Sequence, residues 1–79
     1  MITRQAKEIA YCFLHQKKQV YVHSNMDWQK DDIEMAVAEF VEHIDQQLYN
    51  FLANDKEDFL KNHQHFLEDI NSALELLAN

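Results

Sequence analysis

The 79-residue chain contains neither glycine nor proline. At average usage, the two together would supply roughly nine or ten residues in this length. The absence of glycine removes the preferred residue of tight hairpin turns and excludes the phosphate-binding and EF-hand loops that require it. The chain is instead rich in Ala, Leu, Gln, Glu and Lys, which are good helix formers. The sequence therefore predicts a single all-α domain over residues 1–79, and we expect no cofactor.

Acidic residues dominate the charge of the chain, and they are unevenly spread. The formal net charge is −7; residues 1–30 hold five Lys and Arg against two acids, whereas residues 31–79 hold two against twelve. An acidic chain repels phosphate groups, so we expect no binding to nucleic acid. The longest apolar run near the N-terminus has six residues, which is too short for a signal peptide or a membrane span. We therefore expect a cytoplasmic protein without membrane contact.

Apolar residues recur at steps of three and four in three stretches, as they do along one side of an amphipathic helix. They predict a shorter N-terminal helix at about residues 2–18 and two longer helices at about 28–53 and 55–78. Between the first two stretches, residues 19–27 contain a Val-Tyr-Val triplet that favours strand, followed by turn-forming residues. We interpret residues 19–27 as an extended connection, which could pair as a strand with a second copy.

The two longer stripes predict a three-helix domain built on a long antiparallel αα-hairpin. On one continuous helix, the two stripes would point roughly 80° apart, at about 100° per residue. Asn54 takes the left-handed position after a helix almost as readily as glycine, and Asp55 can cap the next helix with Asp58 in its first turn. One continuous helix that dimerises remains the alternative. The N-terminal helix is too short to cover the hairpin, and exposed apolar surface usually marks an interface, so we expect a homodimer.

Histidines and carboxylates are the side chains most capable of chemistry here. His63 lies in the middle of the last apolar stripe, and the hairpin would place it near Gln47, which predicts a buried polar layer. A zinc or iron site is the sharper alternative, because facing helices could gather these groups. The spacing fits poorly, since the chain has no Glu-x-x-His sequence. The candidate metal ligands are His43, His63, His65 and Asp69.

Cys12 and His15 are three residues apart and therefore share one side of a helix. A thiolate beside an imidazole can act as a nucleophile. The sequence contains no recognisable loop for an oxyanion hole, and a small half-buried cysteine beside a surface histidine is far commoner. We therefore do not expect an enzyme.

The outer face of the second predicted helix is strongly acidic. Its carboxylates have no lysine four residues further on, so they repel one another weakly. The face is either a solvated surface or a docking site for a basic partner, which a dense acidic face captures rapidly. Trp28 could seal the end of the bundle, which we favour, or anchor an interface. The candidate partner-binding residues are Trp28, Asp32, Glu39, Glu42 and Asp45.

These patterns favour a non-enzymatic, homodimeric protein–protein interaction module, of the kind found among small bacterial proteins. An acidic inhibitor or immunity-type protein that binds a basic partner is the first alternative. A metal-binding helical bundle is the second.

Overall fold

The computed structural model describes residues 3–78, and every regular element in that range is helical. Its four α-helices are α1 (Arg4–Val22), α2 (Asp27–His43), α3 (Gln46–Ala53) and α4 (Phe66–Ala78), and a short 3-10 helix, η1 (His63–His65), precedes α4. The all-α prediction is therefore confirmed.

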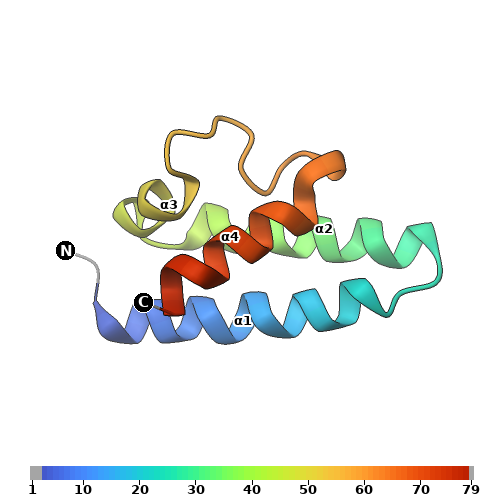
Figure 1. The fold of residues 1–79 in the computed structure, drawn as a ribbon, viewed down its shortest axis with the longest axis horizontal. Coiled ribbons are helices and arrows are strands. Elements are labelled where there is room, and N and C mark those ends of the chain that lie inside the picture. The colour runs from blue at the N-terminus through green and yellow to red at the C-terminus, as the bar shows by residue number, and fades with distance from the viewer. Residues whose placement is uncertain (1–2, 79) are drawn as a thin grey trace.

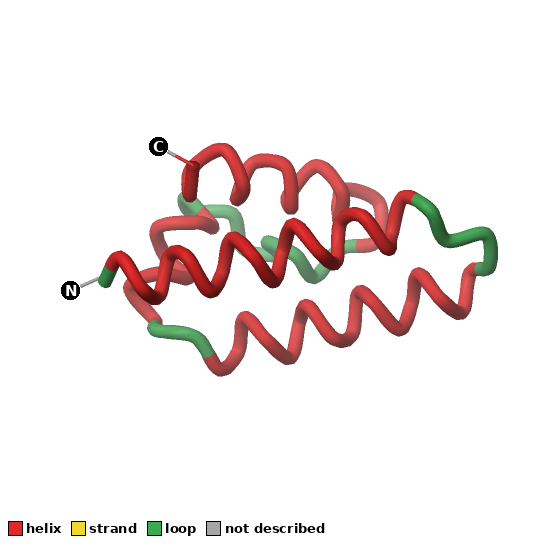
Figure 2. Tube along the Cα trace, turned by 90° about the horizontal axis from the view of Figure 1, so that it is seen from below, coloured by secondary structure: helices red, strands yellow, loops and turns green. Residues whose placement is uncertain are grey.

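The first two helices form an antiparallel pair, and α4 runs at an angle to both, with its C-terminal end beside the N-terminal half of α1 (Figure 1). In the view from below, α1 lies between α2 and α4, and it contacts both of them (Figure 2). α3 packs against α4 near the N-terminal end of α1. The antiparallel hairpin is thus built from α1 and α2, and the prediction that residues 28–53 and 55–78 form it is wrong.

α1 is longer than the sequence predicted, because it continues through the stretch that was interpreted as an extended connection. The Tyr21 ring is buried against Phe66 of α4, with ring centroids 4.9 Å apart. Tyr21 lies two helical turns beyond Leu14, which is also buried, so a helix places both side chains on the core side. This packing outweighs the weak strand preference of the Val-Tyr-Val triplet.

α2 and α3 replace the single helix expected at residues 28–53. The chain leaves the helix at Ile44, whose ψ of 169° is extended, and Asp45 starts the next helix. The Asp45 carboxylate accepts hydrogen bonds from the backbone N–H groups of Gln47 at 2.8 Å and Leu48 at 3.4 Å. This cap satisfies donors that the start of a helix leaves unpaired, so it stabilises the break.

Residues 54–62, here called the 54–62 segment, are irregular and do not begin a second long helix. Asn54 ends α3 in the left-handed region, with φ 49° and ψ 52°, as predicted. Asp55 (φ 68°) and Leu60 (φ 59°) are also left-handed, so Asp55 does not cap a helix at this point. The next α-helix starts only at Phe66.

The 54–62 segment nevertheless contributes to the hydrophobic core. Phe59 and Leu60 are buried, and the Phe59 ring meets Tyr49 of α3 edge-on, with centroids 6.1 Å apart. A left-handed residue other than glycine costs roughly 1–2 kcal/mol. Full burial of a leucine side chain contributes about 1.5–3 kcal/mol, which offsets the conformational cost at Leu60.

Candidate functional site

Five exposed residues of α2 lie along one side of the helix and are here called the outer α2 face. They follow steps of four, three, four and three residues, which keeps them on a single helical side. The opposite side of α2 is buried through Ile33, Val37 and Val41, so the core holds the helix with this face outward. The five residues of the face are Trp28, Asp32, Met35, Glu39 and Glu42.

Two large apolar side chains alternate with three carboxylates on the outer α2 face. The exposed fractions of Trp28 and Met35 are 63% and 70%. Trp28 therefore does not seal the end of the bundle, as we had favoured from the sequence. Its position in the first turn of α2, beside the exposed Met26, leaves the indole ring in solvent. The sequence pointed to the acids but not to Met35, although the spacing of the five residues already contains it.

Asp45 was predicted to belong to the same partner-binding group. The structure places it beyond the end of α2, where its carboxylate caps α3. That role explains why an acid stands there, and it separates Asp45 from the outer α2 face.

His63 lies at the surface, beside α2. Its Nδ1 atom is 2.9 Å and 3.1 Å from the two carboxylate oxygens of Glu34. The hydrogen bond to Glu34 raises the pKa of His63 above its ordinary value of 6.5. Gln47 is exposed on α3, so the predicted buried layer of His63 and Gln47 is wrong. The reason is that His63 precedes α4 and does not belong to its apolar stripe.

Asp31 approaches the same pair. Single ligand atoms of Asp31, Glu34 and His63 all lie within 4.8 Å of one another, close enough to share a divalent cation. These three residues and Lys61 line one surface hollow, and the positive ammonium group of Lys61 disfavours the binding of a metal cation there. Within residues 3–78 this is the one such group of three, so the four predicted metal ligands are not gathered in one place. His43 is exposed at the last residue of α2.

His65 and Asp69 belong instead to a charged group that joins the 54–62 segment to the start of α4, here called the His65 cluster. Nδ1 of His65 lies 2.6 Å from Asp69, and Nε2 lies 3.0 Å from Asp58. Both ring nitrogens therefore meet a carboxylate, which favours the doubly protonated imidazolium. The hydrogen bond to Asp58 raises the pKa of His65, and the same bond lowers the pKa of Asp58. The cluster consists of Lys56, Asp58, His65 and Asp69.

Asp69 is the central acceptor of the His65 cluster. Only 2% of its surface is exposed, and it accepts hydrogen bonds from Lys56 Nζ at 2.7 Å and from the backbone N–H of Leu60 at 2.9 Å. The hydrogen bond to Asp69 raises the pKa of Lys56. These bonds satisfy the buried carboxylate and tie the 54–62 segment to α4, so the cluster is a structural clamp.

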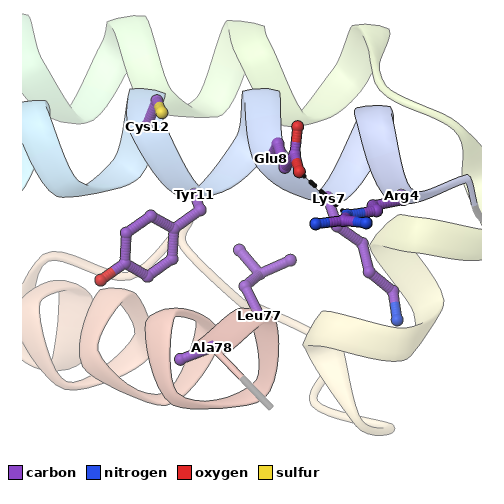
Figure 3. A pocket seen from close by; sticks show the side chains of 7 residues that line it. All are labelled: Arg4, Lys7, Glu8, Tyr11, Cys12, Leu77 and Ala78. Atoms are coloured by element: carbon purple, nitrogen blue, oxygen red, sulfur yellow. Dashed lines mark hydrogen bonds and ion pairs between the residues drawn. The ribbon is translucent and has the colours of Figure 1, made fainter.

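Cys12 lies on α1 at the rim of a cleft of about 620 Å³ between α1 and the C-terminal end of α4. Tyr11 and Leu77 project into this space, whereas the Cys12 thiol lies on the side of α1 away from α4 (Figure 3). The His15 ring stacks on Tyr11, with centroids 5.9 Å apart. Within residues 3–78 no hydrogen bond joins His15 to Cys12, so the structure does not assemble the thiolate–imidazole pair considered above.

No protein-family model, no curated protein and no solved structure matches the chain significantly. Between residues 3 and 78, none of the helices combines the length and the apolar character needed to cross a membrane.

Proposed function

We propose that this protein is a non-enzymatic interaction module that binds a basic protein partner through the outer α2 face. One observation carries the proposal. Trp28 and Met35 are 63% and 70% exposed on the side of α2 that also presents Asp32, Glu39 and Glu42. The apolar side chains that a partner could bury and the carboxylates that could attract it therefore lie on the same face of α2.

The chemistry of the face suits recognition. Tryptophan and methionine are enriched in the cores of interfaces, and tryptophan is among the residues that contribute most to binding. The surrounding carboxylates would accelerate the encounter with a positively charged protein and disfavour acidic competitors. Because the core fixes α2 from its other side, binding would require little ordering of the backbone.

The partner that fits this face presents an apolar groove bordered by lysine or arginine. Trp28 and Met35, seven residues apart, would enter the groove as successive anchors of one helix. The three carboxylates would then meet the basic rim. This is the arrangement expected of an acidic inhibitor of a basic protein.

Trp28 provides a direct test, because it is the single tryptophan of the chain. A synthetic amphipathic helix composed only of leucine and lysine serves as the basic probe. At low salt, we expect it to shift the fluorescence emission of Trp28 to shorter wavelength, with an affinity that falls steeply as sodium chloride is added. An unchanged emission spectrum throughout the titration would refute the proposal.

A matched pair of variants separates the face from net charge. Glu39→Lys reverses one charge on the outer α2 face, and Glu57→Lys makes the same change on the exposed side of the 54–62 segment. We expect Glu39→Lys to weaken binding of the probe by about tenfold or more, and Glu57→Lys to weaken it far less. Equal losses in the two variants would show that only the total charge matters, against the proposal.

A further inference from the structure

A line of exposed side chains without Lys, Arg, Asp or Glu runs along α1 to the residue just beyond it and is here called the α1 seam. Its residues are separated by steps of four, three, four, three and four, which is the spacing of the contact positions in a coiled coil. All are exposed, and Ile9 is 55% exposed. Val20, which is 50% exposed, borders the seam. The residues of the seam are Gln5, Ile9, Cys12, Gln16 and Gln19 of α1, and His23, which follows the helix directly.

The lysines, arginine and glutamate of α1 all lie off the seam. Helix α1 contains five such charged residues in its 19 positions, and the seam excludes every one of them: Arg4, Lys7, Glu8, Lys17 and Lys18. The buried side of α1, through Ala10, Leu14 and Tyr21, points elsewhere, so the seam is not needed to pack the core. Charged residues are depleted in the centres of protein interfaces, and the seam has the same property.

A knob and a hollow occupy opposite halves of the seam. Ile9 protrudes from the N-terminal half. A surface hollow of about 410 Å³ lies at the other end, where Gln19, Val20 and His23 line it together with Gln29 of α2. When two α1 helices lie antiparallel about a two-fold axis near residue 14, Ile9 of each copy meets the hollow of the other, so both contacts form at once.

We propose that a second copy of this chain covers the α1 seam, with the two α1 helices antiparallel. Helix α1 holds four Lys and Arg against one Glu, and all five lie outside the seam, so two seams can meet without a charged side chain of α1 between them. The seam is also self-complementary, because every glutamine amide has both donors and an acceptor to offer to a second glutamine. The antiparallel orientation also sets the two helix dipoles in opposite directions, whereas a parallel pair would place both positive ends together.

This surface is separate from the outer α2 face, so the inference does not depend on the proposed partner. Helix α1 has 19 residues and is about 28 Å long. A contact along one helix of this length covers less than a standard interface. We therefore expect dimerisation in the micromolar range, which leaves the outer α2 face free in both monomer and dimer.

Sedimentation velocity over the micromolar range tests the inference. We expect the wild-type chain to change from monomer to dimer as its concentration rises. Ile9→Lys should weaken dimerisation by at least tenfold, because it puts an unpaired charge where the apolar side chain would enter the hollow of the other copy. Met35→Lys makes the same change of residue class and charge on the outer α2 face, and it should leave dimerisation unaltered while weakening binding of the leucine–lysine probe. Circular dichroism verifies that both exposed substitutions preserve the fold.

Disulfide formation tests the register. In the antiparallel pair, Gln16 lies beside Cys12 of the other copy, so Gln16→Cys should give a covalent dimer rapidly on mild oxidation. Lys18→Cys, on another side of α1, should not. A wild-type chain that stays monomeric, an Ile9→Lys variant that dimerises as well as the wild type, or a wild-type chain that oxidises through Cys12 alone as fast as Gln16→Cys would each overturn the inference.

Discussion

In the α1–α2 pair, the contacts are apolar and follow the helical repeat. Phe13 of α1 stacks on Phe40 of α2, with ring centroids 4.0 Å apart, and Leu14 and Val37 are buried beside them. In the 54–62 segment the backbone follows no repeat, and the His65 cluster fixes it through charged hydrogen bonds. The comparison shows that this small domain relies on apolar burial where its backbone is regular, and adds charged hydrogen bonds to the buried Phe59 and Leu60 where its backbone is irregular. The two regions should therefore respond differently to cavities and to pH.

The largest effect should come from a cavity in the regular region. We expect Leu14→Ala to lower the free energy of unfolding by about 4 kcal/mol, because Leu14 is fully buried and the surrounding helices can collapse only partially. Urea denaturation followed by circular dichroism measures the loss. Val22→Ala, at an exposed position of the same helix, is the control and should cost less than about 1 kcal/mol. Similar losses in the two variants would show that α1 is not held by burial of its inner side.

The second effect concerns the clamp. Asp69→Asn preserves the shape of the side chain but removes the charge that faces Lys56 and His65, and we expect a loss of about 3 kcal/mol in the free energy of unfolding at pH 7. The amide of Leu60, which donates to Asp69, should lose its protection from hydrogen exchange before the amides of α1 and α2 do. Glu57→Gln, an exposed carboxylate of the same segment, should change stability by less than about 0.5 kcal/mol. Uniform loss of protection across the chain would contradict a local clamp.

The third effect is a pH dependence that comes from two histidines, His65 in the clamp and His63 in its pair with Glu34 of α2. The pKa of His65 and the pKa of His63 are both raised in the folded protein, from 6.5, so their stabilisation is complete below pH 6.5 and is lost as the pH rises through the raised values. The pKa of Asp58 is lowered from 3.8, so its stabilisation is present above that pH and is lost as the pH falls through the lowered value. The clamp should therefore be firmest between about pH 4 and pH 6.5.

Stability measured by urea denaturation at pH 5.5 and pH 8.5 checks this window. We expect the wild-type midpoint to fall at the higher pH, and His65→Gln to remove part of the fall. His63→Gln should remove the remainder, because His63 pairs with Glu34 independently of the His65 cluster. A fall that persists in the double variant would assign the pH dependence to other groups.

The helical class, the left-handed residue at Asn54 and the acidic outer side of α2 could all be predicted from the sequence, because each depends on composition or on residues close in the chain. The missed features depend on distant residues. The backbone at Tyr21 is helical and not extended, because the helix places the Tyr21 ring against Phe66, which is far along the chain. Helix α4 starts later in the chain than predicted, and hydrogen bonds from Lys56 and Leu60 to Asp69 hold the irregular segment before it. No local sequence pattern encodes those bonds.

The outer α2 face likewise has features that local sequence predicts and features that depend on distant residues. Spacing alone places the acids of α2 on one side, but whether Trp28 is buried or exposed depends on where the other helices pack. The break before Asp45 is an intermediate case. An aspartate that precedes a helical stretch is a common cap, yet the apolar repeat continues through it and favours an unbroken helix.

The smallest effect should come from the backbone of the irregular region, and it should be a gain. Asp55 is exposed, with φ at 68°, and the chain has no glycine that could take such a position without strain. Asp55→Gly removes a left-handed cost of roughly 1–2 kcal/mol and adds about 0.5–1 kcal/mol of backbone entropy to the unfolded chain. We therefore expect a net stabilisation of about 0.5–1 kcal/mol, measured by urea denaturation at pH 5.5, where the clamp is intact. Gln46→Gly, at the first residue of α3 where φ is helical, should instead destabilise. If Asp55→Gly also destabilised the protein, the Asp55 side chain itself would stabilise the left-handed turn. The difference between the two regions would then include a local capping role for Asp55 in addition to the clamp.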